Sequence, residues 1–83
     1  MNENNGRPEW AQGPEWEGWR WNPHAREMYR PVNSGSVQIE PDNPSDPVLW
    51  VVGDSATNYI KVDRLASALA IANLIAEDRG GWA

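Results

Sequence analysis

The side chains of this chain that could carry out chemistry are few and widely spaced. His24 is the only histidine, so a histidine-dependent triad or a metal site would have to be built on it, with Glu27 as its nearest acid at helical spacing. One such pair is more typical of a surface site. The chain has no cysteine, which excludes disulfides, thiolate zinc sites and a cysteine nucleophile. The sequence therefore predicts a protein that is not an enzyme and that binds neither a metal nor a cofactor.

Two polar loops contain the residue types of ion or phosphate sites without their spacing. Residues 42–46, Asp-Asn-Pro-Ser-Asp, lack the glycine and the final glutamate of an EF-hand calcium loop. Residues 53–58, Gly-Asp-Ser-Ala-Thr-Asn, lack the lysine and the glycine pattern that cradle a phosphate. We interpret the first as a proline-rich turn and the second as a hairpin loop.

Tryptophan is the residue type best suited to binding here. Four of the six tryptophans, at positions 10, 16, 19 and 21, fall in one short window that contains two similar phrases, residues 6–10 and 13–16. A tryptophan combines a large apolar ring with one N–H donor, so such a cluster either covers the protein's own core or contacts a partner. We predict that Trp10 and Trp16 contact a partner, and that Trp19 and Trp21 belong to the core.

Charge and hydropathy limit the classes of partner and location. The net charge is −5, from twelve acidic and seven basic residues. Nucleic acid is not expected as a partner, because phosphate binding requires a basic patch. No segment has the ~18 consecutive apolar residues of a membrane span, and the first residues lack the basic start and apolar run of a signal peptide. We expect a cytoplasmic protein without membrane contact, whose partner is a protein with a basic or hydrophobic surface.

Composition divides the chain at about residue 35. Residues 1–35 contain four prolines and four tryptophans without a sustained period, which predicts an irregular Trp/Pro-rich arm. Two structures compete within residues 19–32. The chain could form a hairpin that turns at residues 22–25, or Asn22 could cap a short helix over 22–30 with Pro23 at its first position. We favour the short helix, because residues 24–28 contain no β-branched side chain.

Residues 36–83 have clearer periodicity. Residues 36–40 alternate, 48–52 are apolar without interruption, and 59–62 alternate again, which predicts three strands. A helix is predicted from Arg64 to about Asp78, with Asp63 as its N-cap and Gly80-Gly81 as its stop signal. The predicted fold is therefore α+β: a small three-stranded antiparallel meander packed by one C-terminal helix, preceded by the arm.

The predicted helix has a wider apolar surface than one sheet can cover. Ile71 and Leu74 lie beyond the stripe formed by its other apolar residues. The arm, a second copy of the chain or a foreign partner could cover them.

The C-terminal half resembles a group of small proteins. Residues 49–54, Leu-Trp-Val-Val-Gly-Asp, and 60–69, Ile-Lys-Val-Asp-Arg-Leu-Ala-Ser-Ala-Leu, are similar to small uncharacterised accessory proteins of actinobacteria and their phages. Those proteins share a strand, a Gly/Asp turn, a strand and an Ala/Leu-rich helix. The resemblance carries over no functional residue. It implies an accessory protein, phage-encoded, that modulates or inhibits a host protein in the host cytoplasm or decorates a virus particle.

Together these features predict a non-enzymatic protein–protein interaction module. The residues predicted to contact the partner are Trp10, Trp16, Arg20, Tyr29, Ile71 and Leu74. Two alternatives remain: a self-associating structural or virion-associated protein that uses the same surface as a homo-oligomer interface, and a tryptophan platform that binds a glycan or a Pro-rich peptide.

Overall fold

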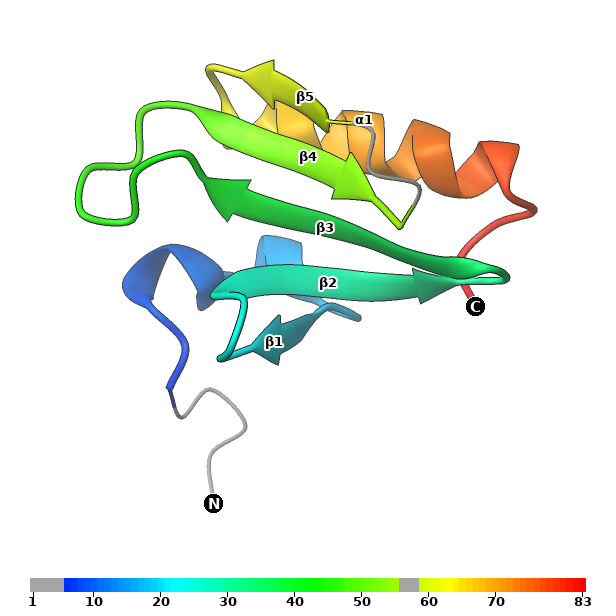
Figure 1. Cartoon of the computed structure of the whole chain (residues 1–83), viewed down its shortest axis with the longest axis horizontal. Coiled ribbons are helices and arrows are strands. Elements are labelled where there is room, and N and C mark those ends of the chain that lie inside the picture. Colours follow the sequence, from blue (N-terminus) through cyan, green and yellow to red (C-terminus); the bar gives the residue numbers. More distant parts are fainter. Residues whose placement is uncertain (1–5, 56–58) are drawn as a thin grey trace.

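The computed structural model describes residues 6–55 and 59–83. Within these residues the chain forms two 3₁₀ turns, five strands and one α-helix: η1 Glu9–Ala11, η2 Pro14–Trp16, β1 Arg20–Asn22, β2 Glu27–Val32, β3 Gly35–Pro41, β4 Trp50–Asp54, β5 Tyr59–Val62 and α1 Leu65–Asp78. The strands form one antiparallel sheet in chain order, β1 to β5 (Figure 1). The α+β class, the three strands of the second half and the C-terminal helix are confirmed, but the sheet has five strands instead of three.

The short helix predicted over residues 22–30 is wrong, because Asn22 caps a turn and not a helix. Its side-chain Oδ1 accepts hydrogen bonds from the backbone N–H groups of His24 and Ala25, at 3.0 and 3.3 Å. The N–H of Arg26 donates to the backbone oxygen of Asn22 at 2.8 Å, and Arg26 has a left-handed φ of 56°. The chain therefore reverses, and β2 returns beside β1.

The division predicted at residue 35 falls in the turn between β2 and β3, two strands that pair from Met28↔Ile39 to Val32↔Gly35. The N-terminal residues consequently supply two strands of the same sheet. Pro31 is tolerated in β2 because it lies beyond the end of β1, where its missing N–H is not needed by a neighbouring strand.

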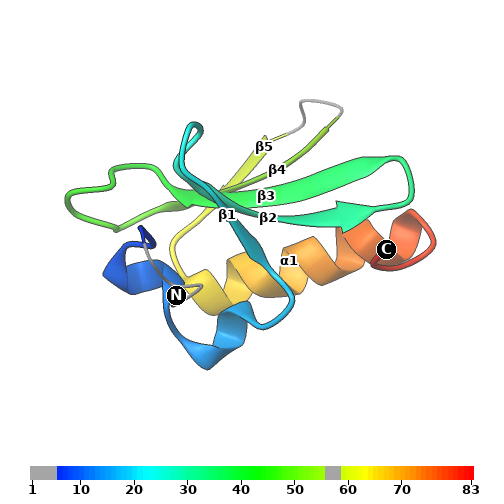
Figure 2. The ribbon, with the colours of Figure 1, turned by 90° about the horizontal axis from the view of Figure 1, so that it is seen from below.

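The two faces of the sheet differ in cover. Met28, Ile39 and Val52 are paired across neighbouring strands and fully buried. Viewed from below, α1 and the two 3₁₀ turns lie on the same side of the sheet (Figure 2). The helix packs against β3, β4 and β5. Residues 6–19, which we call the arm from here on, lie on the part of that face nearer β1. The opposite face, which carries the cross-strand pair Arg20 and Tyr29, has no helix over it in residues 6–55 and 59–83 (Figure 2), and we call it the uncovered face.

Helix α1 approaches the sheet closely through small side chains. Ala68, Ala72 and Ala76 are at most 1 % exposed, and they lie one turn apart on one side of the helix. The predicted Asp63 cap is wrong, because the extended residue Arg64 occupies the N-cap position without a side-chain hydrogen bond.

The predicted glycine stop of α1 is confirmed. Gly80 and Gly81 have φ angles of 90° and 99°. Their N–H groups donate to the oxygens of Glu77 and Ala76, at 3.1 and 2.7 Å. This pair of bonds is a Schellman motif, which turns the chain back toward the sheet.

The six tryptophan rings form one connected set of edge-to-face contacts. The ring of Trp10 contacts Trp16, Trp21 and Trp50, with centroids 5.4–5.8 Å apart. Trp16 then contacts Trp19, and Trp19 contacts the ring of residue 82 at 5.4 Å. Trp16 is 1 % and Trp19 6 % exposed. The arm is therefore a part of the hydrophobic core, and its rings join the beginning, middle and end of the chain.

The last residues of the chain lie along β2. Trp82 forms a bridge with Val32, the guanidinium of Arg30 lies 4.6 Å from its ring centroid, and its Nε1 donates to the Oδ1 of Asn73 at 3.1 Å. Because this bond turns the Asn73 side of α1 toward β2, the opposite flank of the helix, with Ile71, is turned toward β5.

Candidate functional site

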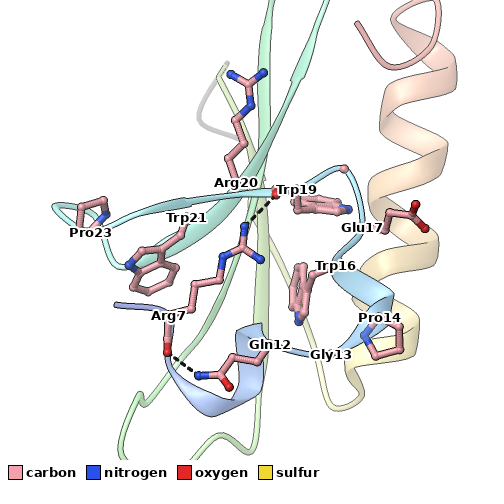
Figure 3. Close-up of a pocket in the computed structure, with 11 residues that line it drawn as sticks. Arg7, Gln12, Gly13, Pro14, Trp16, Glu17, Trp19, Arg20, Trp21 and Pro23 are labelled. Atoms are coloured by element: carbon pink, nitrogen blue, oxygen red, sulfur yellow. Dashed lines mark hydrogen bonds between the residues drawn. The ribbon is translucent and has the colours of Figure 1, made fainter. Parts of the chain in front are cut away.

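A groove of about 970 Å³ lies between the arm and β1. Figure 3 shows the side chain of Arg7 running through it, between the rings of Trp16 and Trp21. The Nη2 of Arg7 donates to the backbone oxygen of Trp19 at 3.2 Å. Gln12 holds this arginine from the other side, because its Nε2 donates to the Arg7 backbone oxygen at 2.8 Å. The groove is thus built around one arginine that lies against the outer edge of the sheet.

Part of the backbone at the β1 edge is occupied by these arm contacts. The backbone groups of Arg20 and Asn22 in β1 point toward β2. Because these groups alternate in direction along an antiparallel strand, the N–H and C=O of Trp19 point away from the sheet. Both are occupied: the Trp19 N–H donates to the Trp16 oxygen at 2.9 Å, and the Trp19 oxygen accepts from Arg7. By the same alternation the N–H and C=O of Trp21 also point outward, so the arm contacts reduce the free edge of β1 to this one residue.

The β5 edge carries no equivalent cover among the described residues. The backbone N–H of Ser55 donates to the backbone oxygen of Ser36, and the N–H of Asp42 donates to the oxygen of Leu49. These bonds identify which residue pairs of the β3–β4 ladder are hydrogen-bonded. By alternation, Trp50 and Val52 face β5, where they pair with Val62 and Ile60. The N–H and C=O groups of Tyr59 and Lys61 therefore point away from the sheet, and they offer two donors and two acceptors to a further strand.

Exposed apolar side chains accompany this edge. Tyr59 is 66 %, Ile60 46 % and Leu74 63 % exposed, and Ile71 is half-buried. Ile60 is on the same side of the sheet as α1, because it pairs with the core residue Val52. We call β5 together with Ile71 and Leu74 of α1 the β5 surface.

The six predicted partner-binding residues do not form one surface. Trp16 is buried, and its Nε1 donates to the Trp10 backbone oxygen at 2.7 Å, so its ring is not exposed to a partner in this fold. Trp10 is half-buried beneath three other rings. The other four residues divide between two places: Arg20 and Tyr29 lie on the uncovered sheet face, and Ile71 and Leu74 lie on α1.

Tyr59 and Ile60 were missed as candidate site residues. Two features of the sequence could have identified them. Residues 59–62 form the last strand of a meander, which makes this strand an edge, and their apolar side chains alternate as in an internal strand.

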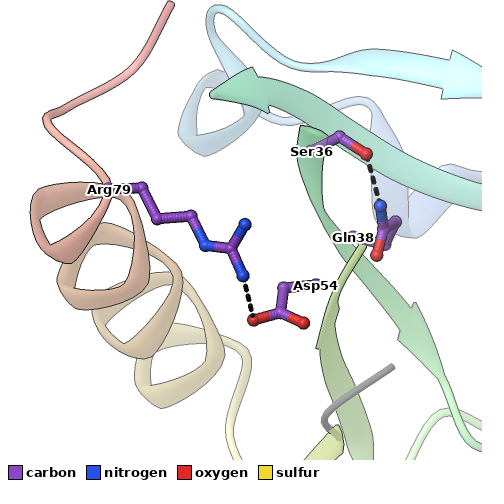
Figure 4. A network of polar contacts seen from close by, with 4 residues as sticks. All are labelled: Ser36, Gln38, Asp54 and Arg79. Atoms are coloured by element: carbon purple, nitrogen blue, oxygen red, sulfur yellow. Dashed lines mark hydrogen bonds and ion pairs between the residues drawn. The ribbon is translucent and has the colours of Figure 1, made fainter. Parts of the chain in front are cut away.

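The polar side chains near the end of α1 hold the helix on the sheet. Arg79 reaches from the end of α1 to Asp54 at the end of β4, and its Nη2 lies 3.0 Å from the carboxylate Oδ2 (Figure 4). Their side chains are 23 % and 10 % exposed. On β3, the Nε2 of Gln38 donates to the Oγ of Ser36. The ion pair joins the end of α1 to β4, whereas the Gln38–Ser36 bond lies within β3, and the two do not converge on one cleft.

Two glutamates lie close together on the uncovered sheet face. Burial raises the pKa of Glu27, and the charge of Glu40 raises it further. Burial also raises the pKa of Glu40, with a further contribution from Asp42. A carboxyl whose folded-state pKa is raised destabilises the fold above that pKa, and the penalty disappears as the pH falls toward the ordinary value.

We expect Glu40→Gln to raise the melting temperature at pH 7. Removing one like charge from a cross-strand neighbour is worth about 0.5 kcal/mol, and the gain should shrink toward zero at about pH 4, where wild-type carboxyls become neutral. Thermal unfolding followed by circular dichroism at both pH values measures it. Glu77→Gln, on the exposed side of α1, is the control for the change in net charge. An equal gain in both variants, or one that persists at pH 4, would contradict the explanation.

Other sites and comparisons add no further candidate. In residues 6–55 and 59–83 there is no cluster of three or more acidic or histidine side chains placed to hold a metal ion. No helix in this part of the chain is long and apolar enough to cross a membrane. No protein-family model, curated protein or solved structure matches the chain.

Proposed function

We propose that the protein is a non-enzymatic protein–protein interaction module that binds its partner at the β5 surface, by addition of a strand to β5. The observation that carries this proposal is the contrast between the two edges of the sheet. At the β1 edge the arm occupies the backbone of Trp19 and leaves only Trp21 outward. At the β5 edge two residues, Tyr59 and Lys61, have outward backbone groups that face solvent beside exposed apolar side chains.

Strand addition suits the chemistry of this edge. Backbone hydrogen bonds supply affinity in such complexes, and alternate side chains supply specificity. A lysine on an edge strand usually discourages pairing, but the Nζ of Lys61 lies 3.2 Å from the carboxylate of Asp42, which sits beyond β3. The ion pair draws this charge across the uncovered sheet face, away from the edge.

In this proposal the tryptophans stabilise the fold, whereas Trp10 and Trp16 were expected to contact the partner. Trp16 and Trp19 are buried and hold the arm against β1, so they support the proposed binding mode indirectly by occupying part of the other edge. A modulator or inhibitor of a host protein, as the phage-protein resemblance implies, would use the same β5 surface.

Photo-crosslinking tests the location of the surface. A benzophenone amino acid is introduced at Tyr59 and, as a matched control, at Tyr29, which is also a tyrosine on the uncovered face but lies in an internal strand. Irradiation of cells that express each variant should yield discrete adducts from position 59 and few from position 29. The absence of adducts at 59, or the same adducts at both positions, would overturn the proposal.

A further inference from the structure

We infer that the strand added to β5 is β5 of a second copy of this chain, paired antiparallel about a two-fold axis at Ile60. The inference rests on the proposed function, and it identifies the partner of the β5 surface. It follows from which backbone groups point outward and which side chains would then meet.

The outward groups restrict the register of such a pair. Tyr59 and Lys61 carry the free backbone donors and acceptors, so hydrogen-bonded pairs must form between these residues. One register pairs Tyr59 of each copy with Lys61 of the other. Placing Lys61 opposite Lys61, or Tyr59 opposite Tyr59, leaves only one hydrogen-bonded pair within β5, whereas the first register has two. The first register is therefore preferred, and it makes the sequence Tyr-Ile-Lys self-complementary.

The side chains match this register on both faces of the sheet. On the uncovered face, each Tyr59 meets the Lys61 of the other copy, so its ring packs against the aliphatic stem of a lysine whose ammonium is held by Asp42. On the opposite face, the two Ile60 side chains form a non-hydrogen-bonded pair, the pair type in which side chains lie closest. Each Ile60 is 46 % exposed in the single chain. This exposed part would be covered by the other copy, since the rest of the side chain is already covered within its own chain.

Helix α1 extends the contact beyond the strands. It lies on the same side of the sheet as Ile60, and its Ile71 flank is turned toward β5. A two-fold axis at β5 brings two such flanks toward each other, with Leu74, 63 % exposed, at their margin. With the axis at Ile60, three residues of each strand are paired, 59–61. A stable dimer interface of ~1,200–2,000 Å² therefore requires contact between the helix flanks as well. A single isologous contact of this kind closes and does not propagate into fibres.

Sedimentation velocity on the purified full chain tests the inference. Wild-type protein should sediment with twice the 9.3 kDa chain mass at high concentration. Ile60→Lys should weaken the dimer by about 100-fold or more, because it sets two like charges against each other at the axis. Val48→Lys, an apolar residue 61 % exposed before β4, makes the same chemical change away from the edge and should leave the dimer intact.

A second variant tests strand pairing itself. Lys61→Pro removes an N–H that points away from the sheet and keeps the hydrogen bonds of Ile60 and Val62 to β4, so it is compatible with an edge strand. It should also yield a monomer, with a far-ultraviolet spectrum that shows a folded chain. A folded Lys61→Pro variant that remains a dimer would overturn β5 pairing, as would a wild-type protein that is monomeric at every concentration.

Salt and crosslinking separate this inference from the broader proposal. Two copies of net charge −5 repel each other, so added salt should tighten the dimer by screening that repulsion. Adducts from position 59 that contain only other proteins would overturn the homodimer and leave the β5 surface as the binding site. No adducts of either kind would overturn both.

Discussion

Replacing Trp16 with alanine is expected to leave the protein at the limit of folding. The ring is 1 % exposed, and truncation of a buried tryptophan costs about 3–5 kcal/mol. A domain of this length has a total stability of the order of 4–12 kcal/mol. Urea denaturation followed by far-ultraviolet circular dichroism measures the loss without relying on the fluorescence of the deleted ring. A loss below about 1 kcal/mol would show that the ring does not fill the core.

Two matched variants separate the causes of this loss. Trp16→Phe keeps an aromatic ring but removes the Nε1 donor to the Trp10 oxygen, and losing that bond should cost about 1 kcal/mol in addition to the smaller ring. Leu74→Ala removes an exposed side chain and should change the free energy of unfolding by less than about 0.5 kcal/mol. All variants should unfold in one transition, because β1 and β2 share a sheet with the rest of the chain. A separate early transition for the arm would contradict this.

Ala72→Leu is expected to have the second largest effect, in this case by overfilling the core. Ala72 is fully buried where α1 meets the sheet. A larger side chain must push the helix outward or adopt a strained rotamer, which costs about 1–3 kcal/mol. Moving the helix would also stretch the 3.0 Å contact between Arg79 and Asp54. The free energy of unfolding in urea is the measurement.

Ala70→Leu is the control for this change. It is the same substitution in the same helix at an exposed position, where leucine is also a good helix former. Its effect should stay within about 0.5 kcal/mol of wild type. Equal losses in the two variants would mean that helix propensity, and not packing against the sheet, explains them.

The second half of the fold could be predicted because its signals are local. The alternation of residues 36–40 and 59–62 and the glycines after α1 specify strands and a helix end without reference to the rest of the chain. The start of α1 was predicted one residue too early, since the capping preference of Asp63 is weak compared with the geometry of the chain leaving β5.

The first half could not be predicted from local signals. Asn22-Pro23 is compatible with both a helix start and a turn, and the choice is made by the pairing of Met28 with Ile39 and of Arg30 with Val37. These contacts join segments that composition alone separates at residue 35. Met28, Arg30 and Val32 share one face of β2, but the segment contains Pro31, which a strand accepts only where no neighbouring strand needs its N–H, so this pattern is not decisive by itself.

The candidate site was predicted only in its α1 component. Ile71 and Leu74 were identified because a single sheet cannot cover so wide an apolar arc. Trp10 and Trp16 were chosen as binding residues on ring size, which does not distinguish a core ring from an interface ring. The location of the candidate site depends on which backbone groups point outward at each edge and on which of them the arm occupies. Both facts depend on the strand order.

The connected indole rings also give the protein an unusual optical character. With centroids 5.4–5.8 Å apart, the ring transitions are close enough to couple electronically, so the chromophores absorb and emit as an array and not as six independent reporters. Excitation energy absorbed near Arg7 can migrate through the arm to the ring that touches Arg30 at the far end of the chain. A structural change near Trp10 or near Trp82 should therefore alter the near-ultraviolet circular dichroism of the whole set of rings.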